Sequence, residues 1–259
     1  MSFGDLIDGV FRLVRANFMA VWPWLVLATL PFEALIAFGS RNGESITTIL
    51  THLGSVQDQT ISSGSDQALV FGGSIGLWLV MPIVSGVVCR TVAASYLGQQ
   101  LRAADAVRVG AGQVWALLVA SLLGHLLELA GFCLCILPGL AFVTLLFLSA
   151  PAIVLEGLGP MAGMGRSWRL VKRRFWPVFG TALLGVLLGA VIVDLVSAVP
   201  EAAAALASSH VRAVIDAVVG TAGSALEWTI YATLATMIYF DQRIRQEGLD
   251  LELMAAQAR

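Results

Sequence analysis

Six stretches of this sequence are apolar over the length needed to cross a membrane, and they constrain the fold more than any other feature. The first five cover residues 18–38, 68–88, 113–137, 139–154 and 176–199. The sixth ends at Phe240 and begins between Val211 and Ala222. A membrane-spanning helix needs about 20 such residues. The sequence therefore predicts an all-α, polytopic membrane protein with six transmembrane helices arranged as three hairpins.

Composition excludes a soluble protein. Only 12% of the residues are charged, against about 25% in soluble domains. The formal net charge of −2 gives no positive field that would attract nucleic acid. Lys172 is the single lysine among the 15 basic residues, and this arginine bias suggests a high-GC bacterial genome. We therefore expect a protein of the bacterial cytoplasmic (inner) membrane that binds no nucleic acid.

The basic residues predict the orientation of the spans. Thirteen of them fall in four segments, residues 1–17, 89–112, 155–175 and 241–259, which alternate with the outer segments. The outer segments hold only Arg41 and Arg212. Because short loops rich in Lys and Arg stay in the cytoplasm, both termini are predicted to be cytoplasmic. Residues 40–67 then form the largest outer loop.

An amphipathic stretch precedes each odd-numbered span, over residues 3–15, 102–114 and 160–175. In the third, one apolar stripe is formed by Met161, Met164, Trp168, Val171 and Phe175. Such helices lie in the membrane interface with the apolar face towards lipid. We interpret the chain as a single membrane domain, 1–259, in which an interfacial helix plus a hairpin is used three times, over 1–97, 98–156 and 157–245, with a cytoplasmic tail over 241–259. The alternative is that any interfacial helix entering a membrane has this pattern.

Three stretches carry a resemblance to a known family: residues 3–9, residues 150–157 continuing into 166–171, and residues 239–248. On these stretches the chain resembles the bacterial membrane domain named after glycerophosphoryl diester phosphodiesterases, and related uncharacterised multi-pass proteins. The resemblance covers most of the chain. It implies that phosphodiester chemistry belongs to a separate soluble barrel. This sequence contains no polar stretch long enough for such a barrel, so the resemblance predicts no enzyme.

Ionisable residues within the spans form the first candidate site, because they are costly at membrane depth and often functional. They are Glu33, His125, Glu128, Asp194 and Glu227. At about 1.5 Å per residue the four acids fall in the outer half of the membrane, where repeated hairpins would bring them to one vestibule. The alternative is that they reach the outer interface or bond a neighbouring backbone.

The sequence predicts no catalytic residue, metal or cofactor. His125 and Glu128 do not form the zinc signature His-Glu-x-x-His. Cys133 and Cys135 lack the two-residue gap of a zinc site, and we expect free, buried thiols.

The basic third amphipathic helix is the second candidate site. Its charges are Arg166, Arg169, Lys172, Arg173 and Arg174. They predict binding of anionic lipid headgroups or docking of a cytoplasmic protein, with Arg166, Arg169 and Arg173 opposite the apolar stripe. The alternative is that these charges follow only from the positive-inside rule, with the neighbouring tryptophans in an aromatic belt. Glu156 would then form a salt bridge with Arg166 or Arg169.

These features together favour a non-enzymatic scaffold or partner subunit that engages lipid or another membrane protein. An oligomer is compatible with the sequence. The alternative is a small-solute, cation-coupled or proton-coupled transporter or channel that uses the outer-half acids.

The predicted orientation can be measured with single cysteines. Cysteine at Ser62, in the outer loop, should react with an impermeant thiol reagent in intact spheroplasts, whereas cysteine at Gln246 should react only after permeabilisation. The chain with its native cysteines gives the background. Equal labelling of both sites, or the reverse pattern, would contradict six spans with cytoplasmic termini.

Overall fold

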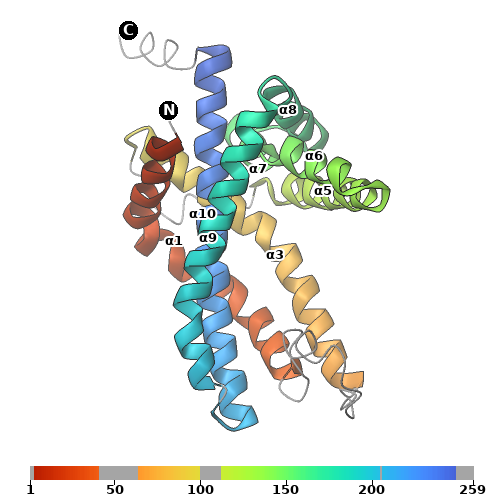
Figure 1. Ribbon diagram of the computed structural model, residues 1–259, viewed down its shortest axis with the longest axis vertical. Helices are drawn as coiled ribbons and strands as arrows, with labels where there is room; N and C mark the ends of the chain where they lie inside the picture. Colours follow the sequence, from red (N-terminus) through yellow and green to blue (C-terminus); the bar gives the residue numbers. More distant parts are fainter. Residues whose placement is uncertain (1–2, 41–63, 100–111, 205, 249–259) are drawn as a thin grey trace. The chain divides into compact units, whose positions relative to one another are not determined.

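The computed structural model describes residues 3–40, 64–99, 112–204 and 206–248, and these residues form helices and no strand. The helices (Figure 1) are α1 (Phe3–Ser40), α3 (Gly64–Tyr96), α5 (Val114–Leu134), α6 (Ile136–Leu146), α7 (Ser149–Glu156), α8 (Pro160–Lys172), α9 (Phe175–Ala204) and α10 (Ser209–Glu247). Within the described part, six helical segments are long and apolar enough to cross a membrane, with α6 and α7 counted together. The predicted all-α architecture with six spans is confirmed.

The predicted boundaries need correction at several helices. α1 runs unbroken from Phe3 through both the first amphipathic stretch and the first span. No glycine or proline lies between Gly9 and Pro23 to interrupt it. α10 begins at Ser209, before the predicted start, and its 39 residues span about 58 Å, against a hydrocarbon core of about 30 Å. It therefore extends beyond the membrane.

The third amphipathic stretch forms a separate helix, as predicted. α8 begins at Pro160. Proline suits the first position of a helix, because a backbone N–H at that position would have no partner within the helix. α8 ends at Lys172, where the N–H of Arg174 donates to the carbonyl of Val171 at 2.9 Å and turns the chain into α9. The second amphipathic stretch lies almost entirely outside the described residues, as do most of the outer loop and the tail after residue 248.

The chain divides into two compact units, each built from separate segments. Unit 1 comprises Met1–Trp22, Pro82–Ala190 and Trp228–Arg259, and unit 2 comprises Pro23–Met81 and Val191–Glu227. Two of the divisions fall at a proline inside a helix, Pro23 in α1 and Pro82 in α3. Proline removes a backbone hydrogen bond and kinks a helix. The threefold repeat stays a prediction.

In unit 1 the turn between α5 and α6 is a single residue. Cys135 has an extended backbone, with φ −174° and ψ 160°, so the third span ends at Leu134 and the fourth begins at Ile136, each three residues earlier than predicted. The helices pack closely because a Cβ on Gly131 would lie 2.9 Å from the Cα of Gly139. The thiols of Cys89, Cys133 and Cys135 are free, as predicted, but only Cys89 is buried. Cys135 forms this tight turn and Cys133 lies two residues before it, and both side chains are exposed.

The fourth span contains a break between α6 and α7 that the sequence did not predict. Pro151 cannot donate a hydrogen bond to the carbonyl four residues earlier. Ser167 of α8 satisfies the backbone at the break: its Oγ accepts from the N–H of Leu148 at 3.1 Å and donates to the carbonyl of Leu145 at 2.6 Å. The side chain of Ser167 is fully buried.

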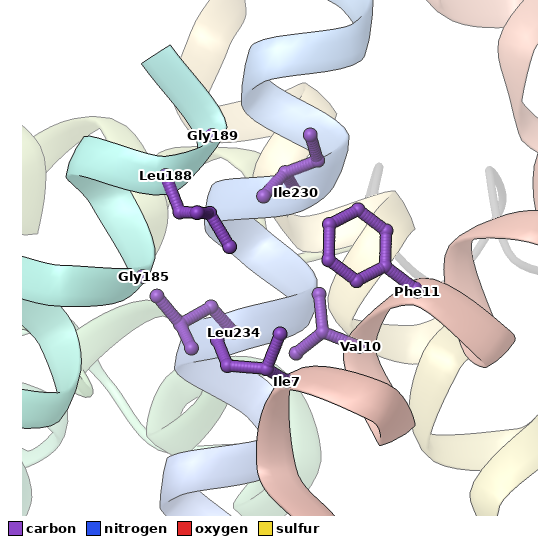
Figure 2. Close-up of a pocket in the computed structure, with 8 residues that line it drawn as sticks. All are labelled: Ile7, Val10, Phe11, Gly185, Leu188, Gly189, Ile230 and Leu234. Atoms are coloured by element: carbon purple, nitrogen blue, oxygen red, sulfur yellow. The ribbon is translucent and has the colours of Figure 1, made fainter. Parts of the chain in front are cut away.

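A second packing feature of unit 1 is an apolar gap between α1, α9 and α10. Figure 2 shows the side chains of three helices converging on it: Ile7, Val10 and Phe11 from α1, Leu188 beside Gly185 and Gly189 from α9, and Ile230 and Leu234 from α10. The gap has a volume of about 10 Å³. A space of this size without polar partners holds no ordered water. We therefore assign it to packing rather than to ligand binding.

Unit 2 contains a close contact between α3 and α1 at the glycine-rich sequence over residues 72–76. A Cβ on Gly73 would lie 2.7 Å from the backbone oxygen of Phe32, and one on Gly76 would collide with the Phe32 ring. Gly73 and Gly76 therefore permit close packing of the two helices. Gly72 differs, because a Cβ there would meet no atom within 4 Å.

Two adjacent glycines therefore give a matched test of this packing. Gly73→Ala should lower the free energy of unfolding by about 1–3 kcal/mol, because backbone atoms of α1 must move. Gly72→Ala should leave it unchanged or slightly raised, because alanine favours a helix. Thermal unfolding of the purified chain in detergent measures both. Equal effects of the two variants would contradict the contact.

Candidate functional site

The most connected polar side chain of unit 1 is Arg166 of α8, which lies between two carboxylates. Its Nε donates to Oε1 and Oε2 of Glu156, at the end of α7, at 2.9 and 3.0 Å. Its Nη1 and Nη2 bind both carboxylate oxygens of Glu247, at the end of α10, the second at 2.7 Å. The Glu247 pair uses the two-pronged geometry in which guanidinium and carboxylate match best, whereas Glu156 shares the single Nε–H between its two oxygens. One side chain thus joins three helices.

Further side chains of α10 extend this arrangement. Arg243 Nε lies 3.0 Å from Glu247 and 3.9 Å from Glu156. The hydroxyl of Tyr239 donates to Oε1 of Glu156. One turn from Arg243 towards the C-terminus, Gln246 donates to the carbonyl of Leu170 in α8 at 2.8 Å. We name Glu156, Arg166, Arg243 and Glu247 the charge cluster.

Local sequence places the cluster. α7 ends at Glu156 because Gly157 adopts the left-handed conformation, with φ 67°, that glycine accepts readily. α8 then packs closely on α7, since a Cβ on Gly163 would collide with Ile153. This contact brings Arg166 to Glu156. The predicted salt bridge from Glu156 to Arg166 is confirmed.

The cluster is partly shielded from solvent. The side chain of Arg166 is 17% exposed, that of Glu156 20% and that of Glu247 28%. Hydrogen bonding to Glu247 raises the pKa of the Arg166 guanidinium, burial opposes this, and Glu156 raises it further. The cluster thus brings two arginine and two glutamate side chains together in a partly shielded place.

The burial of α8 changes the interpretation of its faces. The side facing the protein consists of Gly163, Met164, Ser167, Leu170 and Val171. Met164 and Val171 of the predicted lipid-facing stripe are therefore covered by protein, whereas Met161 and Trp168 are 67% and 38% exposed. The small side chains of glycine and serine let this side of α8 approach α7 closely. The spacing of apolar residues in the sequence does not reveal this.

The other charges of α8 differ from Arg166. Arg169, Lys172 and Arg173 are exposed and Arg174 is half-buried. Within the described residues none of these four forms an ion pair. Of the predicted outward triad, Arg166 has its carboxylate partners inside the chain, and only Arg169 and Arg173 point away.

The residues of the first candidate site fall in different units. Glu33, Asp194 and Glu227 belong to unit 2, and His125 and Glu128 to unit 1. Their convergence on one vestibule stays a prediction. Glu33 accepts a hydrogen bond from the hydroxyl of Ser224 in α10 at 2.5 Å. Asp194 and Glu227 are exposed.

His125 has a partner in its own helix. Its Nδ1 lies 2.6 Å from the carbonyl oxygen of Ser121 and donates to it. Glu128, one turn further along α5, is half-buried.

The sequence did not indicate the hydrogen bond from Ser224 to Glu33, because no spacing rule links residues 191 positions apart.

The comparison with protein families identifies one match. A family model described as "Domain of unknown function (DUF7847)" matches residues 10–242. No curated protein and no solved structure matches the chain.

Removing the central guanidinium tests the cluster. Arg166→Gln should lower the free energy of unfolding by about 2 kcal/mol, because Glu156 and Glu247 lose their charged hydrogen bonds in a partly shielded place. Arg212→Gln is the control, since its 3.5 Å pair with Asp216 is an exposed pair within one helix turn, worth about 0.3–0.5 kcal/mol. Thermal unfolding in detergent measures both, and equal losses would contradict a special role for Arg166.

Proposed function

The chain belongs to the family described as a domain of unknown function (DUF7847), and from its own residues we propose that it is a non-enzymatic scaffold of the bacterial inner membrane that engages anionic lipid through α8. In this proposal both termini are cytoplasmic, and α8 lies at the cytoplasmic interface. The resemblance to the membrane domain of glycerophosphoryl diester phosphodiesterases belongs to the same proposal.

The observation that carries this proposal is the exposed side of α8. Met161, Trp168 and Lys172 are spaced by seven and four residues, which places them along one line of the helix. Arg169 and Arg173 lie beside this line. All five are exposed. An apolar edge with an adjoining basic edge is the pattern of a helix lying in the membrane interface.

Two physical effects favour anionic lipid as the ligand. Each basic residue near an anionic surface contributes about 1 kcal/mol, within about one Debye length. Aromatic side chains such as Trp168 and Trp176, which is 75% exposed, prefer the headgroup level. Three unpaired charges and two indoles would therefore act together at the cytoplasmic leaflet.

The charge cluster supports a scaffold role, because it restrains α8. Arg166 and Leu170 attach the protein-facing side of α8 to α10, and Ser167 attaches it to the α6–α7 break. A helix restrained on one side presents its other side in a fixed orientation, which reduces the entropy lost on binding.

The alternative, a transporter using the outer-half acids, has less support. Glu33, one of the five residues it requires, already accepts a hydrogen bond from Ser224. A neutral hydroxyl partner satisfies this acid without a bound cation. The transporter stays a hypothesis.

A triple substitution tests the proposal. Added phosphatidylglycerol should raise the unfolding temperature of the wild-type chain in detergent more than phosphatidylcholine does. Arg169→Gln with Lys172→Gln and Arg173→Gln should remove most of that difference, because the unpaired charges are lost. Insertion should persist, since ten of the predicted cytoplasmic basic residues remain. High salt should also reduce the wild-type difference between phosphatidylglycerol and phosphatidylcholine.

The matched control keeps the charges. Arg169→Lys with Arg173→Lys should retain the preference for phosphatidylglycerol. A triple Gln variant that is correctly inserted and keeps the full preference would contradict lipid engagement by α8. A triple Gln variant that inserts in the wrong orientation would assign these charges to topology alone.

A further inference from the structure

A second feature of unit 1 lies beside the charge cluster, where the end of α3 meets α7 and α10. A cavity of about 150 Å³ is lined there by Arg90, Leu97 and Gln99 from α3 and the residues following it, by Leu155 from α7, and by Tyr239 and Arg243 from α10. Leu97 is 41% exposed and Gln99 is exposed, so the cavity opens to the outside of the protein at this edge.

Among the described residues, Arg90 has no carboxylate partner for its charge. Its Nε is buried and makes no hydrogen bond, and Arg90 forms no ion pair within the described residues. A buried donor without a partner costs free energy, and a shielded cation without an anion costs more.

Arg243 faces the same cavity with unused donors. It approaches Glu247 and Glu156 through Nε. Among the described residues, its two terminal amino groups have no hydrogen-bond partner. The cluster pairs its two arginines with two glutamates, and Arg90, which forms no ion pair within the described part of the chain, adds a further positive charge to the cavity wall.

We propose that this cavity binds the phosphate group of an anionic lipid headgroup, held between the guanidinium groups of Arg90 and Arg243. Guanidinium groups are the preferred partners of phosphate oxygens, because their fork matches two oxygens at once. Bound phosphate would supply the partner that Arg90 Nε lacks. The proposal deepens the proposed lipid engagement by naming a specific site, and it rests on that proposal for the cytoplasmic orientation.

The size and lining of the cavity fit this ligand. About 150 Å³ corresponds to roughly five waters, which suits a phosphate group and is too small for a drug-sized ligand. Leu97 and Leu155 provide apolar surface beside the two arginines. The acyl chains of a lipid phosphodiester would gain from contact with this apolar surface, whereas free phosphate has no apolar part to place there.

Native mass spectrometry of the intact chain in detergent tests the site by counting bound lipids. The wild type should retain one phosphatidylglycerol that resists dilution, and phosphatidylcholine should bind more weakly. Arg90→Leu should weaken that one binding event by roughly tenfold or more without loss of thermal stability, because no ion pair is broken. Arg90→Lys, which keeps the charge but not the fork, should have an intermediate effect.

Further outcomes separate the site from the function of α8. If the triple Gln variant of α8 retains the one tight lipid, the cavity binds lipid independently. If Arg90→Leu binds lipid as the wild type does, the cavity proposal is wrong, whether or not the α8 variant loses its preference. If inorganic phosphate displaces the lipid completely at low concentration, the site recognises free phosphate and the lipid assignment is wrong. Leu97→Trp, which fills the exposed edge, should weaken the same binding event, and it replaces Arg90→Leu should that variant fail to fold.

Discussion

The geometry around α8 depends on the hydrogen bonds of the Arg166 guanidinium. This guanidinium is bound on one side by Glu156 and on the other by Glu247, so the ends of α7 and α10 are fixed to α8. Where lipid surrounds a protein, apolar contacts between helices gain little over contacts with lipid tails. Directed polar contacts and close packing must then supply the specificity. In unit 1 the charge cluster supplies the directed polar contacts.

Close packing is the second source of specificity, and glycine is the residue that permits it. Gly163 lets α8 approach Ile153 of α7, and Gly73 lets α3 approach the backbone of α1. The two kinds of contact are linked in unit 1. A side chain at residue 163 would move α8 away from α7, and Arg166, three residues further along the same helix, would then lose Glu156. Small residues therefore set the distance that the charge cluster requires.

The sequence predicted much of the fold because its strongest signal, span-length hydropathy, is local. The six spans and the separate helix α8 follow from it, and the salt bridge from Glu156 to Arg166 follows from opposite charges near each other in the chain. The break at Leu148 and the hydrogen bond from Ser224 to Glu33 were not predicted, since both depend on partners far apart in sequence. The apolar stripe of α8 was only half right, because hydropathy does not distinguish a side facing protein from a side facing lipid.

The basic residues on and around α8 thus differ in their surroundings although they have the same charge. Arg166 and Arg243 are neutralised by carboxylates of the same chain, and they stabilise the fold. Arg169, Lys172 and Arg173 are exposed and have no such partners in the part of the chain that the structure describes. Arg90 is also unpaired, but its Nε is buried. An exposed cation is solvated by water and needs no ligand, whereas a shielded one is costly until an anion arrives. Because of this difference in solvation, Arg90 favours a site that binds one phosphate. The exposed charges of α8 favour a diffuse attraction to the membrane surface.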